Sequence, residues 1–185
     1  MISDDKYITC SVCMETMRNL YEIAAAFRES APYKTLKEDA IEHIIRNVCN
    51  PDKKEGRWIR MQDIVEVKDS FSSSMRLKLV QPGGEMACKE ECKSIRRSCE
   101  KLLLFEDEEE DNGFDMEQLV VYLYKDKGKE EGEDGVEGEG GFEALQKAVC
   151  RKRCGDGTPK LLLPEGYQRV DFPFVAKSER MGEEM

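Results

Sequence analysis

The sequence has no long hydrophobic run, no extended run of basic residues and only one histidine. No apolar stretch approaches the roughly 20 residues that cross a bilayer, so we expect a protein that is not transmembrane. The basic clusters at residues 96–97 and 151–153 are too short to follow a phosphate backbone, so nucleic acid is not an expected partner. His43 cannot be joined to a Ser or Cys nucleophile from the sequence, and we interpret it as a partly exposed helix residue. We therefore expect no catalytic residue, cofactor or metal, and predict that the protein is not an enzyme.

Acidic residues are concentrated in one part of the chain. The 185 residues carry a net charge of −10, and residues 106–141 alone hold 15 Asp or Glu and 3 Lys, a net charge of −12. Residues 126–141 combine Gly with acidic residues and have too little apolar surface to offset the entropy of ordering. We predict that they form a disordered acidic loop. Weak calcium binding is the alternative, although the run lacks the ligand spacing of an EF-hand loop.

Eight cysteines are far more than a cytosolic chain of this length usually keeps as free thiols. They occupy positions 10, 13, 49, 88, 92, 99, 150 and 154. The even number predicts a disulfide framework and therefore an oxidising location, in the lumen of the endoplasmic reticulum or outside the cell. The opening residues, MISDDKY, have neither the basic region nor the apolar region of a secretory leader, so we expect that the signal peptide is missing from this sequence.

Two kinds of hydrophobic periodicity divide the chain. Apolar residues recur every three or four positions, as on a helix with one buried face, at residues 10–30, 34–49, 88–103, 115–125 and 142–154. Residues 57–80 differ, because MRLKLV alternates with period two and WIRMQDIVEV is rich in β-forming residues. We therefore predict a mainly α domain over residues 8–154, with a β-hairpin inserted at 57–80 and an extended or disordered tail at 155–185.

The first and last cysteine pairs have the spacing of two facing helices. Cys10 and Cys13 are three residues apart and Cys150 and Cys154 are four apart, so on antiparallel helices Cys10 can join Cys154 while Cys13 joins Cys150. Two alternatives stay open. Cys10 and Cys13 can form a redox-active pair near a helix N-terminus, or all four thiolates can bind zinc.

The four middle cysteines allow two arrangements. We predict that Cys49, at the end of the second helix, joins Cys92, because the inserted hairpin brings these helix ends together. Cys88 then joins Cys99, which requires the helix to begin near Cys92, since 11 helical residues would separate the two sulfurs by about 16 Å. The competing arrangement joins Cys49 to Cys99 and Cys88 to Cys92, but a bridge between residues i and i+4 within a helix is strained.

The cysteine positions resemble the six-cysteine pattern of saposin-fold proteins. More narrowly, they resemble the canopy family of endoplasmic-reticulum proteins, in which an insertion separates the second and third helices. The stretches CKEECKSIRRSCEKLL and DFPFVAKSE are similar to plant and algal canopy-like sequences. The resemblance covers roughly residues 8–178, although the closing Cys150–Cys154 spacing is narrower than in saposins. It implies a saposin-like, disulfide-linked helical domain.

By this resemblance the protein is expected to be a non-catalytic luminal co-chaperone or adaptor that binds client membrane or secreted proteins, together with other chaperones. The alternative is a saposin-type lipid-binding or lipid-transfer protein, because such helices can open and expose their apolar faces. The candidate partner-binding residues are Leu103 and Phe105 in LLLF, Tyr122 in LVVYLY, and Trp58 on the hairpin. For Trp58 the alternative is packing onto the helices.

Overall fold

Five α-helices and one β-hairpin form the described part of the chain, which in this computed structural model comprises residues 4–69, 74–103, 116–124, 141–154 and 162–167. In chain order the elements, with η for a 3-10 helix, are α1 (Asp5–Ser30), η1 (Pro32–Lys34), α2 (Glu38–Asn47), η2 (Arg57–Met61), β1 (Asp63–Lys68), β2 (Met75–Val80), α3 (Glu90–Leu103), α4 (Met116–Tyr124) and α5 (Gly141–Cys154). This confirms the expected mainly helical fold with a small β-hairpin.

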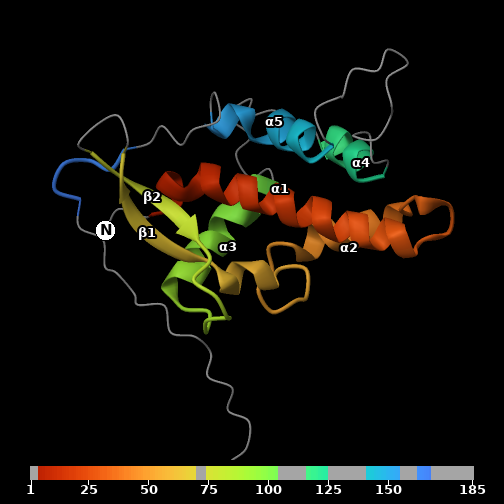
Figure 1. The fold of residues 1–185 in the computed structure, drawn as a ribbon, viewed down its shortest axis with the longest axis horizontal. Helices are drawn as coiled ribbons and strands as arrows, with labels where there is room; N and C mark the ends of the chain where they lie inside the picture. Colours follow the sequence, from red (N-terminus) through yellow and green to blue (C-terminus); the bar gives the residue numbers. More distant parts are fainter. Residues whose placement is uncertain (1–3, 70–73, 104–115, 125–140, 155–161, 168–185) are drawn as a thin grey trace, which may run out of the picture.

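The long helix α1 lies in the middle of the molecule and packs against both α3 and α5 (Figure 1). Its apolar stripe of Cys13, Met17, Leu20 and Ala24 is completely buried, so this face of α1 is turned toward the core. The helix begins at Asp5, five residues before the predicted start. It ends where Ala31 becomes extended, as expected for a residue that precedes a proline.

The helices α2 and α3 also pack against α1 and bury apolar residues in the core. On α2, Ile41 and Ile44 are buried, and on α3 the buried stripe comprises Cys92, Ile95, Cys99 and Leu102. Both helices are shorter than predicted, and α3 begins only at Glu90, two residues after Cys88. This late start decides the disulfide pairing described below.

The inserted segment forms an antiparallel hairpin, but its strands begin later than predicted. Residues 63–68 pair with residues 75–80, in a register that places Ile64 opposite Leu79. Residues 57–61, predicted as strand, form the 3-10 helix η2 instead, because Trp58 and Ile59 are drawn into the core. Beyond the hairpin, the backbone N–H of Leu163 donates to the carbonyl oxygen of Met75 at 2.8 Å, so Leu163 lies beside the start of β2.

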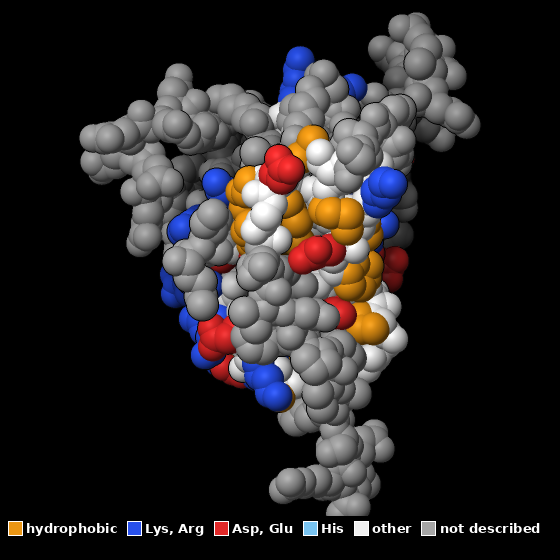
Figure 2. Space-filling model, turned by 90° about the vertical axis from the view of Figure 1, so that its left-hand side faces the viewer, with side chains coloured by type: hydrophobic (Ala, Val, Ile, Leu, Met, Phe, Trp, Pro, Cys, Tyr) orange, Lys and Arg blue, Asp and Glu red, His pale blue; other side chains and the backbone are white. Residues whose placement is uncertain are grey.

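Figure 2 shows the end of the molecule that lies on the left in Figure 1. There, apolar side chains gather in a strip that acidic side chains interrupt. None of the helices in the described ranges is both long enough and apolar enough to span a bilayer. The predicted acidic loop, apart from Gly141 at the start of α5, lies outside the described residues, and so does the predicted tail apart from residues 162–167.

Candidate functional site

Two disulfides join the beginning of the helical body to its end. Cys10 is bonded to Cys154 and Cys13 to Cys150, with Cα–Cα distances of 5.0 Å and 5.8 Å. This is the pairing predicted for antiparallel α1 and α5. Because each bridge closes a loop of about 140 residues, the loop-entropy model gives each about 5 kcal/mol of stabilisation when formed alone.

The two alternatives for these four cysteines do not fit the structure. A redox-active pair forms its disulfide between its own two cysteines, whereas Cys10 and Cys13 are each bonded to α5. A zinc site needs free thiolates, and none of the eight cysteines is free. Several disulfides fit an oxidising secretory or extracellular location.

The predicted pairing of the four middle cysteines is wrong. The structure joins Cys49 to Cys99 and Cys88 to Cys92, not Cys49 to Cys92 and Cys88 to Cys99. The prediction rejected the Cys88–Cys92 bridge because it placed both residues within one helix. Cys88 in fact lies in the non-helical segment before Glu90, so its backbone can turn toward Cys92.

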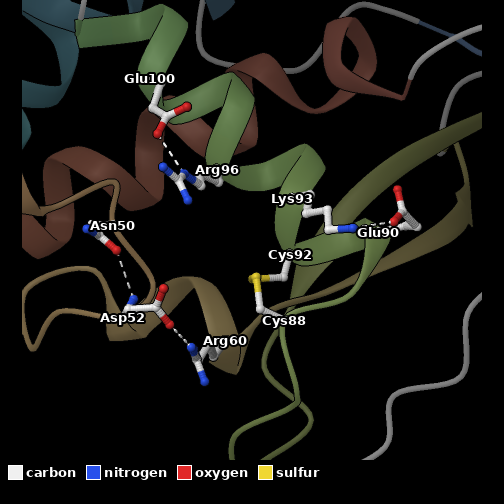
Figure 3. Close-up of a disulfide and its surroundings, with 9 residues drawn as sticks. All are labelled: Asn50, Asp52, Arg60, Cys88, Glu90, Cys92, Lys93, Arg96 and Glu100. Carbon is white, nitrogen blue, oxygen red and sulfur yellow. Dashed lines mark hydrogen bonds and ion pairs between the residues drawn. A yellow bond between two sulfur atoms is a disulfide. The ribbon is translucent and has the colours of Figure 1, made fainter.

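The Cys88–Cys92 disulfide differs from the other three in its position. Its partners are only four residues apart in sequence, whereas Cys49 and Cys99 are 50 apart. Cys88 is partly exposed, whereas the other seven cysteines are buried. Figure 3 shows this bridge at the start of α3, where Lys93 donates to the Glu90 carboxylate at 2.7 Å. That hydrogen bond, with the charge of Lys93, lowers the pKa of Glu90.

The predicted partner-binding residues mostly belong to the core. Trp58 is only 5% exposed, and its indole N–H donates to the carbonyl oxygen of Val48 at 2.9 Å. Leu103 is also buried, and Tyr122 is half-buried against the core. Leu103 therefore offers no contact surface, and for Trp58 the alternative, packing into the helical body, is the one found. Phe105 lies outside the described residues.

Besides Leu162, four large apolar side chains are exposed among the described residues. Val121 and Tyr124 lie in the LVVYLY stretch, from which Tyr122 was predicted, whereas sequence reasoning missed Phe27 and Tyr33. Phe27 on α1, Val121 and Tyr124 on α4 are 41–42% exposed, and Tyr33 on η1 is 95% exposed. We call this set the apolar end. The guanidinium of Arg28, next to Phe27, donates to the carbonyl oxygen of Leu123 and so ties the end of α1 to the end of α4.

Tyr33 has an unusual backbone within the apolar end. Its φ of 67° is the only positive φ among the described non-glycine residues. For a bulky L-residue this left-handed conformation is uncommon and costs free energy. The conformation occurs in η1, between α1 and α2, and the Tyr33 ring is exposed to solvent.

A second surface feature is a charged pocket of about 220 Å³ beside η2. We call it the basic pocket. Its lining residues are Pro51, Asp52, Lys53, Lys54, Arg57, Arg60 and Glu85. Arg57 forms an ion pair with Glu85, and Arg60 forms one with Asp52 (Figure 3). The pocket therefore contains four cationic and two anionic side chains.

The loop that carries the basic pocket is held by many short-range contacts. The Asn50 side chain accepts from the backbone N–H of Asp52 at 3.0 Å, and the backbone N–H of Lys53 donates to the carbonyl oxygen of Asn50 at 3.0 Å. Gly56 lies so close to Asn50 that an added Cβ would be 2.0 Å from its carbonyl oxygen. The Cys49–Cys99 bridge attaches this loop to α3. The pocket is therefore part of the rigid scaffold.

Comparison with known proteins identifies no relative of this chain. No protein-family model, no curated protein and no solved structure matches it. Conclusions about function therefore rest on the residues and geometry described above.

Proposed function

We propose that the protein is a non-catalytic, saposin-like adaptor or co-chaperone in the lumen of the endoplasmic reticulum, where it binds client membrane or secreted proteins. The observation that carries this proposal is the apolar end, with Phe27, Tyr33, Val121 and Tyr124 exposed on a scaffold joined by disulfides. Large aromatic side chains contribute strongly to protein interfaces, because they bury much area at little entropic cost.

The arrangement of the apolar end supports a role in binding. Val121 and Tyr124 are three residues apart and share one face of α4, and Phe27 is adjacent to Arg28, which contacts Leu123. Isolated exposed apolar residues are common, but large apolar side chains exposed on helix ends that a hydrogen bond joins are suited to a shared interaction surface. The strained backbone of Tyr33 adds to this support, because strain persists where the surrounding structure over-determines it and often marks functional positions.

Site-specific photo-crosslinking tests the proposal. A benzoylphenylalanine is placed at Tyr124 in the full chain, which is directed to the secretory pathway by an added leader. The matched control carries the same residue at Leu162, which is 39% exposed but lies beside the hairpin. We expect secretory or membrane proteins, identified by mass spectrometry, to be crosslinked from position 124 and not from position 162. Equal crosslinking from both positions, or none, contradicts the proposal.

A defined client gives a second readout. We expect a secreted protein that is kept unfolded by reduction and carboxymethylation to bind the chain. The double substitution Val121→Ser and Tyr124→Ser should weaken this binding about tenfold, because it removes two large apolar contacts. Leu162→Ser is the control and should leave binding unchanged.

Lipid binding is the alternative function and makes a different prediction. In the LLLF and LVVYLY stretches, the described leucines, which are Leu102, Leu103, Leu119 and Leu123, are buried, so lipid would have to open the helical body. We expect no co-sedimentation with liposomes of phosphatidylcholine and phosphatidylserine at neutral pH. Co-sedimentation without any bound client would favour the lipid-transfer alternative over the adaptor.

A further inference from the structure

We propose that the basic pocket binds acidic segments of client proteins, an inference that rests on the proposed adaptor function and names a second contact for it. The pocket is about 220 Å³ in volume, less than the roughly 300–1,000 Å³ of sites that enclose a small molecule. It is also open to solvent along the loop that carries the exposed residues Asp52, Lys53 and Lys54. A pocket of this kind suits side chains that project from a larger partner.

The charges of the pocket select for carboxylates. Lys53 and Lys54 are exposed and have no carboxylate partner among the residues that the structure describes. Arg57 pairs with Glu85 through Nε and Arg60 pairs with Asp52 through Nη2, which leaves the other donors of each planar guanidinium for a ligand. Adjacent ammonium and guanidinium groups can thus hold two carboxylates that are close together in a partner.

The Arg60 side chain is mostly buried, with 18% exposed, and its ion pair with Asp52 fixes its position in the lining of the pocket. The loop contacts of Asn50 and Gly56 hold the pocket in shape, so a ligand would bind with little ordering of the protein.

The charge of the pocket favours a short acidic segment over a nucleic acid. The pocket holds four cationic side chains beside two anionic ones, so its positive charge is confined to a few positions. At physiological salt, charges further than about 8 Å are largely screened. A few carboxylates can therefore bind locally, whereas an extended phosphate backbone cannot follow a basic surface.

Fluorescence anisotropy with defined peptides tests the inference. Fluorescein-labelled hexaglutamate is titrated with the oxidised full chain at 0.15 M salt, and hexaglutamine is the control peptide. The variant Lys53→Glu/Lys54→Glu is compared with Lys37→Glu/Lys101→Glu, which makes the same charge change at exposed lysines elsewhere. We expect hexaglutamate to bind wild type, and the pocket variant to bind about tenfold more weakly than the control variant. Equal binding by both variants, or equal binding of hexaglutamine, overturns the inference.

The two proposals can fail separately. If wild type captures clients through position 124 but hexaglutamate binding does not depend on Lys53 and Lys54, the pocket inference fails and the adaptor function stands. If hexaglutamate binds through these lysines but no client is captured, the adaptor function fails and the pocket remains an anion-binding site. Thermal melts of both double variants, expected to match wild type within about 3 °C, show that folding does not explain a loss of binding.

Discussion

The guanidinium of Arg28 donates to the backbone carbonyl oxygen of Leu123 at 2.7 Å, across 95 residues of sequence. Arg28 is near the end of α1 and Leu123 is near the end of α4. The hydrogen bond therefore joins the C-terminal ends of the two helices. The guanidinium also lies over the ring of Tyr21, 5.6 Å from its centroid. Arg28 is thus a buried charge that fastens one helix to another.

Replacing Arg28 with Met should therefore destabilise the protein. The variant loses a charged hydrogen bond and leaves the Leu123 carbonyl without this donor, so we expect the free energy of unfolding to fall by about 2 kcal/mol. Urea denaturation followed by circular dichroism measures the change. The control Arg46→Met removes an exposed ion pair with Glu42 and should change stability by less than about 0.5 kcal/mol. Equal effects of the two substitutions would show that the contact between α1 and α4 contributes little.

The four disulfides should contribute unequally to stability. Replacing all four cysteines of the Cys10–Cys154 and Cys13–Cys150 bridges with Ala opens loops of 144 and 137 residues, and replacing Cys88 and Cys92 with Ala opens one of only 4 residues. The loop-entropy model gives losses of about 5 kcal/mol or more for the first variant and about 2 kcal/mol for the second. We expect the second variant to remain the more stable in guanidinium chloride. The reverse order would contradict the loop-length argument.

The helical architecture could be predicted from sequence because the apolar stripes coincide with the core. On α1, Met17 and Leu20 are buried as their spacing predicts. The bridges between α1 and α5 could also be predicted, because three- and four-residue spacings place both cysteines of a pair on one face. The partner of Cys88 could not, because it depends on a helix boundary at Glu90, and boundaries are the least reliable part of a pattern.

The apolar end could not be predicted because tertiary packing decides which apolar residues stay exposed. In LVVYLY every side chain is apolar or aromatic, yet Leu119 and Leu123 are buried while Val121 and Tyr124 are exposed. When every position of a helix is apolar, hydrophobic periodicity cannot show which face of the helix is buried and which is exposed. Trp58 shows the opposite case, since its burial depends on a hydrogen bond to Val48 that no local pattern reveals.

Substituting Gly56 should destabilise the loop that carries the basic pocket. A Cβ at this position would lie 2.0 Å from the Asn50 carbonyl oxygen and 2.3 Å from its carbonyl carbon, so the backbone must move. We expect Gly56→Ala to lower the free energy of unfolding by about 1–3 kcal/mol and to weaken hexaglutamate binding. The control is Gly83→Ala, where an added Cβ meets nothing within 4 Å but the backbone has a φ of +97°. That variant should lose stability through backbone strain alone and keep the peptide affinity.

The pH dependence of stability should include a contribution from Glu15. Burial raises the pKa of its carboxyl above the usual value, although Arg18 lowers it and Glu22 raises it further. The folded state therefore holds this proton more tightly than the unfolded state, so the contribution is fully present below about pH 4.5 and is lost as the pH rises through the folded pKa. We expect Glu15→Gln to be slightly more stable than wild type at pH 7, by less than about 1 kcal/mol after solvent screening.

Measuring the free energy of unfolding of Glu15→Gln and wild type at pH 4 and pH 7 tests this expectation. The difference between the two proteins should shrink at the lower pH, where wild-type Glu15 takes up its proton. Glu42→Gln removes the same charge at an exposed position and is the matched control. A constant difference across this range would mean that the Glu15 carboxyl titrates alike in the folded and unfolded chains.

Trp58 is the only tryptophan of the chain, so its fluorescence reports directly on the junction between α2 and η2. Because the indole is buried and hydrogen-bonded to the Val48 carbonyl, we expect blue-shifted emission that moves to the red on unfolding. Trp58→Phe keeps an aromatic ring but removes the N–H donor, and should lower the free energy of unfolding by about 1–3 kcal/mol, as circular dichroism would show. Emission of wild type at the wavelength of a solvated indole would place Trp58 at the surface and return it to the candidate partner contacts.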